Sequence, residues 1–393
     1  MARYDYLIVG GGMTADAAAR GIREADPSGS LAVIAAEPHP PYNRPPLSKG
    51  LWKGDAPDTI WRKTDEAGAE LLLGRRVTSL DPKEKRVRDD RGGEHGYGKL
   101  LLATGGTPRR LPGESDRIIY FRTWDDYVRL HSFAGRELRF AVIGGGFIGT
   151  EIAAALRMTG RDVTMLVPEP GLGARVYPAK LSAFLVDYYR EKGVEVRTGE
   201  GMRGFRPKGE GFVIQTTTGA ELEADVDVAG LGIQPAVELA EQAGLATDNG
   251  IVVDEHLRTS DSGIYAAGDV ASFHNPALGN RLRVEHEDNA NTMGRFAGLN
   301  MAGRPTPYHH LPFFYSDLFD LGYEAVGDTD ARHETVADWK DPFREGVVYY
   351  LRDGRIRGVL LWNTWGQVDN ARALIADPGP FSAKTVRGRL PLQ

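Results

Sequence analysis

The chain has 393 residues, enough for two or three domains, and 41% of them are hydrophobic, as in a globular protein. Its 48 lysines and arginines against 54 aspartates and glutamates give a net charge of −6, which argues against a nucleic-acid partner. The sequence has no cysteine, so redox-active thiol pairs, thiolate zinc sites and disulfides are excluded. Because it shows no apolar run of about 18 residues and no signal-peptide layout, we expect no membrane span and a cytoplasmic location.

The first informative feature is a glycine-rich turn near the start. Residues 6–9 predict a buried strand, Gly10-Gly-Gly12 a tight bend, residues 15–25 a helix and residues 31–36 a second strand. Such a turn lets a pyrophosphate approach the backbone, where the amide groups and dipole of the helix hold its charge. Glu37 ends the second strand, so it is either an acceptor for a ribose diol or a solvated loop carboxylate.

A proline-rich segment, residues 40–49, follows, and it cannot be strand or helix interior before Leu47. A rigid segment of this kind either presents side chains to a ligand or acts as a linker. Short strands predicted at 70–73 and 86–88 lead to a buried strand that begins at Lys99. That strand ends in the glycine turn Ala103-Thr-Gly105 and closes the first block of the chain.

The pattern of the first turn recurs inside the chain. A strand begins at Phe140 and ends in Gly144-Gly-Gly146, a helix with an apolar stretch over 152–156 follows, and a second strand over 162–167 runs toward Glu169. One such glycine motif is a weak signal, because ordinary loops also match it. Two copies, each with its strand and helix, predict two dinucleotide sites in one chain.

The remaining elements suggest how the domains are arranged. The sequence predicts a helix over 179–192 and short strands over 195–197, 212–216 and 226–229. Residues 259–269 then form a strand that ends in Gly-Asp, like a return to the first block, so we expect the second nucleotide-binding domain to be inserted into the first. Alternating aromatic segments at 313–319, 346–351 and 357–362 predict an antiparallel sheet.

The expected fold is therefore α/β, with two Rossmann-like dinucleotide-binding domains and a C-terminal α+β domain that contains the antiparallel sheet. The expected boundaries are 1–111 and 235–304 for the first domain, 112–234 for the inserted domain and 305–393 for the last.

Several segments resemble a known family over nearly the whole chain. They are Arg44-Pro-Pro-Leu-Ser-Lys49, Ala103-Thr-Gly-Gly-Thr-Pro-Arg109, Gly144-Gly-Gly-Phe-Ile-Gly-Thr-Glu151, Ala267-Gly-Asp269, Arg283-Val-Glu-His286, Tyr323-Glu-Ala-Val-Gly327 and Tyr350-Leu-Arg352. The chain resembles the FAD- and NAD(P)-dependent pyridine nucleotide-disulfide oxidoreductase superfamily, and within it the ferredoxin-reductase and apoptosis-inducing-factor branch. The likeness implies that the first site takes FAD and the second NADH.

The resemblance also implies roles for particular residues. Lys49 is expected beside the reactive edge of the flavin, paired with Glu151, and Phe147 between flavin and nicotinamide. His286 is expected as a flavin neighbour at the start of a helix. Cofactor contacts are further expected from Gly10, Gly12, Thr14, Ala15, Glu37, Arg44, Ala103, Thr104, Gly105, Gly144, Gly146, Ile148, Gly232, Asp269, Glu285 and Tyr315.

Coenzyme preference is left open between two residues. Glu169 stands where the apoptosis-inducing-factor branch holds the NAD ribose, which favours NADH. Arg175 lies nearby in the sequence and would instead suit the 2′-phosphate of NADPH.

The function implied by the resemblance is transfer of hydride from NADH to FAD and then of electrons to an acceptor. We expect a ferredoxin- or rubredoxin-type protein, because arginines gather near the end of the chain at 352, 355, 357, 372, 387 and 389; a solvated charged face is the alternative. Two other readings are an NADH:quinone or oxygen reductase, and a redox-responsive interaction protein with a long-lived NADH-reduced charge-transfer state. We expect no set of metal ligands and no nucleic-acid partner. A homodimer is one option for the oligomeric state.

Overall fold

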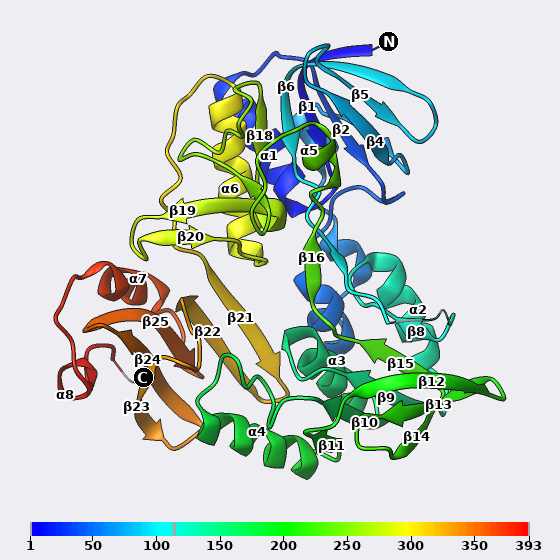
Figure 1. Ribbon diagram of the computed structural model, residues 1–393, viewed down its shortest axis with the longest axis vertical. Coiled ribbons are helices and arrows are strands. Elements are labelled where there is room, and N and C mark those ends of the chain that lie inside the picture. Colours follow the sequence, from blue (N-terminus) through cyan, green and yellow to red (C-terminus); the bar gives the residue numbers. More distant parts are fainter. Residues whose placement is uncertain (1, 112, 114, 392–393) are drawn as a thin grey trace. The chain divides into compact units, whose positions relative to one another are not determined.

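The computed structural model describes residues 2–111, 113 and 115–391, and the chain divides into two compact units (Figure 1). Unit 1 comprises Met1–Asn43, Pro57–Thr107 and Gln234–Pro312. Unit 2 comprises Arg44–Ala56, Pro108–Ile233 and Phe313–Gln393. The strands β7 (Gly106–Pro108) and β16 (Ile233–Pro235) contain two of the points where the chain passes from one unit to the other. The three-domain division remains a prediction.

Unit 1 is built on a largely parallel sheet. Its order is β3-β2-β1-β6-β5-β4, and β18 also pairs with β6. The central strands are continuous apolar runs with Leu7, Ile8 and Leu101 fully buried, as expected for parallel strands covered on both faces. The strands are β1 (Ala2–Val9), β2 (Leu31–Ala35), β3 (Glu70–Leu73), β4 (Val77–Asp81), β5 (Arg86–Asp89), β6 (Glu94–Leu102) and β18 (Ile264–Ala266).

Two helices of unit 1 cross at very short range. A Cβ added to Gly294 or Gly298 of α6 (Glu287–Met301) would lie 2.5 or 2.2 Å from a backbone oxygen of α1 (Met13–Ala25). Glycine is therefore needed where the two backbones approach each other. The other elements of the unit are η3 (Pro57–Ile60), η4 (Thr64–Ala67), α5 (Glu238–Gln242), β17 (Ile251–Val252), η5 (Gly268–Val270), β19 (Ala271–Asn275) and β20 (Asn280–Leu282).

Unit 2 contains a second parallel sheet, of order β11-β10-β9-β15-β8, and a three-stranded antiparallel sheet, of order β12-β13-β14. The parallel strands are β8 (Ile118–Ile119), β9 (Arg139–Ile143), β10 (Asp162–Val167), β11 (Glu195–Thr198) and β15 (Val226–Ala229). The antiparallel strands are β12 (Met202–Lys208), β13 (Gly211–Thr216) and β14 (Glu221–Ala224). The helices are α2 (Trp124–Ala134), α3 (Phe147–Met158) and α4 (Ala179–Glu191).

The last part of unit 2 is a five-stranded antiparallel sheet of order β21-β22-β25-β24-β23. Its elements are β21 (Phe313–Leu318), β22 (Leu321–Gly327), β23 (Glu334–Asp341), β24 (Glu345–Arg352), β25 (Arg355–Trp362), α7 (Val368–Ala376) and α8 (Ala383–Val386). Both parallel sheets and this sheet confirm the predicted α/β fold class.

The proline-rich segment differs in one detail from the prediction. The 3-10 turn η1 covers Pro45–Ser48 and so begins two residues before Leu47, and η2 covers Gly50–Lys53. Proline is tolerated in a first helical turn because its missing N–H has no partner there, and its fixed φ suits the turn. Residues 44–49 of the segment thus lie in unit 2 and contain the turn η1, whereas residues 40–43 lie in unit 1.

A carboxylic acid, Asp227, is buried in the core of unit 2. Asp227 on β15 is 0% exposed, and neither of its side-chain oxygens has a hydrogen-bond partner among the described residues. Burial raises the pKa of Asp227 to about 8, so the folded protein binds a proton there at pH values where the unfolded chain has released it. Stability from the neutral acid is therefore lost as the pH rises from about 4 to about 8.

We predict that Asp227→Asn removes this pH dependence. Between pH 5 and 7 the free energy of unfolding of the unmodified protein should fall by about 1.4 kcal/mol per pH unit relative to the variant, since one proton separates the two states. Urea unfolding at several pH values measures the difference between the two proteins, which cancels the other titrating groups. Parallel pH profiles would show that Asp227 does not hold a proton in the fold.

Candidate functional site

The first glycine turn contains two glycines that are needed for different reasons. Gly10 has φ +128°, and a Cβ there would lie 2.1 Å from the carbonyl oxygen of Ala103, so the fold itself requires glycine. Gly12, the N-cap of α1, has an ordinary φ of −91° and open space within 4 Å of a Cβ position. Glycine at position 12 therefore leaves room at a helix start, where a phosphate is favoured. Thr14 and Ala15 follow in the buried first turn of α1.

The second turn repeats this division in unit 2. Gly144 has φ +103°, and a Cβ there would lie 2.4 Å from the carbonyl oxygen of Gly230. Gly146, the N-cap of α3, has φ −83° and no neighbour within 4 Å of a Cβ position. Each unit thus has a glycine turn with open space at a helix start, which is consistent with the two predicted dinucleotide sites. The glycine at 232 has φ +80° and is equally open.

Exposed apolar side chains stand at the start of α3. Phe147 and Ile148 are more than a third exposed, and the Phe147 ring packs edge-on against Phe314 with 5.0 Å between centroids. An exposed aromatic ring beside a nucleotide cradle offers a stacking surface. This position is consistent with the predicted place of Phe147 next to a nicotinamide, which stays a prediction.

Glu37 is held in place by a residue that the sequence did not indicate. The hydroxyl of Tyr42 donates to Glu37 Oε2 at 2.6 Å, and the buried Tyr42 ring packs edge-on against Trp61 at 5.7 Å. Tyr42 thereby orients the carboxylate that we expect to meet a ribose. The sequence signal that could have indicated Tyr42 is its position in the rigid segment, with prolines on both sides.

The return segment of unit 1 brings further predicted residues to the first turn. Gly268 lies against the Thr14 side chain, since a Cβ on it would be 2.3 Å from Thr14 Oγ1, and Asp269 follows in η5. Thr104 donates to the carbonyl oxygen of Ala236 at 2.8 Å, beside Ala103 and Gly105 in the same unit. The tertiary structure therefore gathers these sequence-distant residues of unit 1 around the N-terminal end of α1.

The helix expected at the flavin begins at Glu287, slightly later than predicted, with His286 as its N-cap residue. Glu285 pairs with Arg283 at 2.6 Å. Burial lowers the pKa of His286 to about 4, against the opposing charges of Asp269 and Asp288. His286 is therefore neutral at pH 7, which suits a hydrogen-bonding neighbour rather than a cation.

Lys49 and Glu151 form the predicted ion pair inside unit 2. Lys49 Nζ lies 2.8 Å from Glu151 Oε1, and the two side chains are 12% and 3% exposed. The Lys49 ammonium also lies 5.2 Å from the centroid of the Tyr315 ring. Two serines that the sequence did not indicate, Ser48 and Ser316, donate to the same carboxylate. Arg44 belongs to the same unit and donates to the carbonyl oxygen of Arg122 at 2.7 Å.

The two residues weighed for coenzyme preference contact each other. Arg175 NH2 lies 2.9 Å from Glu169 Oε1, with Arg175 exposed and Glu169 partly buried. The carboxylate therefore partly neutralises the arginine that would otherwise attract a 2′-phosphate.

The predicted arginine surface needs one correction. Arg357 on β25 is only 6% exposed, and burial lowers its pKa. It lies among the buried residues of this strand, which makes it a packed residue rather than part of a contact surface. Arg355 and Arg372 are only partly exposed. Arg352, Arg387 and Arg389 are exposed, as expected.

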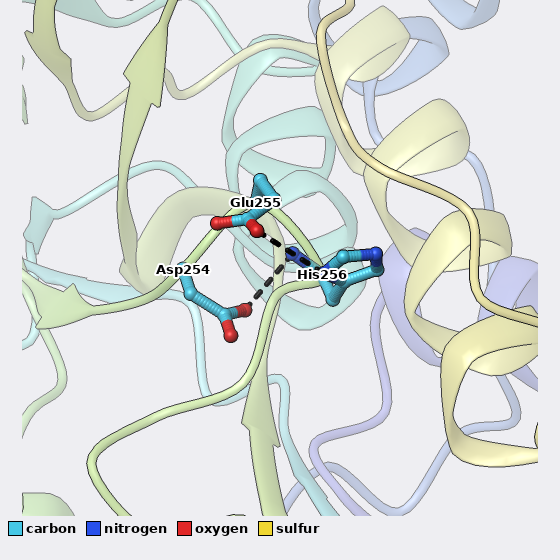
Figure 2. Close-up of side chains that lie close together, drawn as sticks. All are labelled: Asp254, Glu255 and His256. Atoms are coloured by element: carbon cyan, nitrogen blue, oxygen red, sulfur yellow. Dashed lines mark hydrogen bonds and ion pairs between the residues drawn. The ribbon is translucent and has the colours of Figure 1, made fainter.

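A group with metal-ligand chemistry occurs in unit 1, where none was predicted. Figure 2 shows Asp254, Glu255 and His256, whose ligand atoms lie within 4.8 Å of one another. Asp254 already accepts from the backbone amides of His256 and Arg258, both at 2.9 Å, and from the Arg258 side chain at 2.8 Å. These bonds explain the cluster as a turn.

In the part of the chain that the structure describes, no helix is long and apolar enough to cross a membrane.

Comparison with known proteins gives consistent matches over most of the chain. Residues 4–294 match the model of the pyridine nucleotide-disulphide oxidoreductase family, and residues 297–342 and 337–377 match that of the C-terminal part of mitochondrion-associated apoptosis-inducing factor. The ferredoxin reductase subunit of 5,5′-dehydrodivanillate O-demethylase from Sphingobium sp. is 35% identical, with 96% of this chain and 94% of that protein covered.

Two further matches have the same extent. The ferredoxin–NAD(+) reductase component of the anthranilate 1,2-dioxygenase system from Burkholderia cepacia is 36% identical, with 97% of both chains covered. The reductase in a solved covalent complex of putidaredoxin reductase with putidaredoxin superposes with a TM-score of 0.90 at 31% identity, covering 97% of this chain and 94% of that chain.

We predict that Gly12→Ala weakens binding of the first dinucleotide, whereas Gly10→Ala damages the fold. The Gly12 methyl would occupy only open space, so the apoprotein should keep its melting temperature but bind the first dinucleotide at least about tenfold more weakly, a loss of about 1.4 kcal/mol. Flavin absorbance after purification and thermal unfolding measure the two effects. Normal flavin retention in Gly12→Ala would contradict the placing of a ligand there.

Proposed function

The chain belongs to the pyridine nucleotide-disulphide oxidoreductase family, and on that premise we propose that it passes electrons from NADH to a ferredoxin-type iron–sulfur protein. The family confirms that the protein is a flavoprotein oxidoreductase that uses FAD and NADH. The observation that carries the choice of acceptor is that relatives named as ferredoxin reductases match almost the whole chain. The absence of any cysteine excludes transfer through the disulfide that gives the family its name.

Without a thiol pair, electrons have to leave the flavin for an external acceptor directly. When bound, FAD supplies the chemistry, accepting hydride from NADH and releasing electrons. The chain's own residues bind and orient: the open space at Gly12 and Gly146 supports a pyrophosphate at each helix start, and Glu151 holds the Lys49 ammonium in a buried place. Neutral His286 adds no charge of its own.

Relatives and charge both support an iron–sulfur acceptor. The Sphingobium and Burkholderia relatives, which match this chain over at least 94% of each protein, are named as ferredoxin reductases. The superposed reductase was solved in a complex with putidaredoxin. Exposed arginines near the end of the chain, Arg352, Arg387 and Arg389, provide positive charge suited to an acidic partner. A rubredoxin in place of a ferredoxin, and a homodimer, remain predictions.

The test is a panel of acceptors under saturating NADH. We expect kcat/KM for an acidic ferredoxin to exceed that for rubredoxin, a quinone or dioxygen by at least about tenfold, and to fall steeply as salt screens the charges. Ferricyanide serves as the control, because its reduction reports hydride transfer without a protein partner. Faster turnover with quinone or oxygen would reject the ferredoxin proposal.

Coenzyme choice gives a second prediction. Glu169→Ala should narrow the preference for NADH over NADPH by about tenfold, since it removes an acceptor for the ribose diol and releases Arg175 for a 2′-phosphate. The double variant Glu169→Ala with Arg175→Ala should lose the gained NADPH activity. Steady-state kinetics with both coenzymes measure the ratio. If the unmodified protein prefers NADPH, the residue that selects the coenzyme is Arg175 and not Glu169.

A redox-responsive interaction protein is the second candidate function. The match of residues 297–342 and 337–377 to the apoptosis-inducing-factor C-terminal model favours it. Reduction by NADH in a stopped-flow instrument followed by exposure to air separates the candidates. A sensor stays reduced for minutes, whereas a reductase is reoxidised within seconds once ferredoxin is added.

A further inference from the structure

The Glu151 carboxylate is a buried anion held by three donors. Ser48 Oγ lies 2.5 Å from Oε2, Ser316 Oγ 2.6 Å from Oε1 and Lys49 Nζ 2.8 Å from the same Oε1. All four residues lie in unit 2, and the two serine side chains and Glu151 are buried. Short bonds to an ionised group are among the strongest hydrogen bonds in proteins.

The surroundings of this carboxylate are aromatic. Burial raises the pKa values of Tyr177, Tyr189 and Tyr323, and the negative charge of Glu151 raises each of them further. In such a place the loss of a donor to a charged group is costly, because the surrounding rings do not replace it. Each of the three donors is therefore needed to keep the anion in one position.

The two carboxylate oxygens of Glu151 contact different donors. Among the described residues, Oε2 accepts from the Ser48 hydroxyl, which lies in the same turn as Lys49, whereas Oε1 accepts from Ser316 and contacts the Lys49 ammonium. Ser316 lies on β21, directly after Tyr315, whose ring lies 5.2 Å from the ammonium. Strand β21 thus contacts the ammonium directly through Tyr315 and indirectly through Ser316 and Oε1.

We infer that Ser316 is a positioning residue, which sets the place of the Lys49 ammonium by fixing Oε1 of Glu151. The inference rests on the proposed function, because the resemblance places Lys49 at the flavin. A positive charge held beside the flavin favours its electron-rich reduced form. Ser316 therefore acts on the flavin reduction potential through two intervening residues, without a contact of its own.

Ser316→Ala in the FAD-loaded protein tests this role. We expect unchanged flavin content and unchanged KM for NADH, a rate of flavin reduction about tenfold lower, and an equilibrium constant for reduction about tenfold lower. The latter equals a potential about 30 mV more negative for a two-electron couple. Potentiometric titration gives the potential independently of turnover, and Ser316→Thr, which keeps the hydroxyl, should restore it.

Two serine variants serve as controls. Ser48→Ala removes an equally short bond to the oxygen that does not hold Lys49, so its potential should shift by less than half as much. Ser182→Ala removes a buried bond of 2.7 Å to the carbonyl oxygen of Leu172, outside this network, and should leave the potential unchanged. Equal shifts in Ser316→Ala and Ser48→Ala, or no shift in Ser316→Ala, would overturn the inference.

Lys49→Ala separates this inference from the proposed function. In the Lys49→Ala background, Ser316→Ala should shift the potential no further, because the charge that it positions is gone. A lowered potential in Lys49→Ala with none in Ser316→Ala rejects the role of Ser316 alone. An unchanged potential in Lys49→Ala rejects the place of the pair at the flavin. Failure to reduce ferredoxin with all potentials as expected rejects only the acceptor.

Discussion

Both nucleotide cradles depend on the close approach of two backbones at the end of a parallel strand. A side chain on Gly10 or Gly144 would collide with the backbone of the neighbouring strand's exit, at 2.1 and 2.4 Å. These contacts fix where each following helix begins. Because the helix start is fixed, the amide groups of the first turn face an open volume that the second glycine of each motif, at 12 and 146, leaves unfilled. The same constraint operates separately in the two units.

Charge is treated differently at three buried positions of unit 2. Glu151 forms an ion pair with Lys49 and accepts hydrogen bonds from two serines. Asp227 has no such donors among the described residues, and it binds a proton instead. Arg357 is packed in a sheet, where burial lowers its pKa. Of these three, only the Lys49–Glu151 pair holds a buried charge at a fixed position beside a partner of opposite charge. A charge held in this way can influence a redox cofactor.

The missing cysteines give this chain a different chemistry from the disulfide reductases that name its family. A flavin without a thiol relay has to meet its acceptor at an exposed position. Charged residues on the protein surface then select the acceptor. We connect the exposed arginines near the end of the chain with an acidic partner.

Local pattern was enough for much of this protein. The strands, turns and helices around both glycine motifs have clear local periods and turn residues, so the sequence predicted them, and family motifs indicated that Lys49 and Glu151 pair. The tertiary structure alone decided which groups complete that pair. Ser316 is 165 residues from Glu151, the sequence indicated no role for it, and the sheet that ends the chain brings it to Oε1. It also decided that Arg357 is buried and that Asp227 has no described partner, because burial depends on what packs against a strand, which no local pattern records.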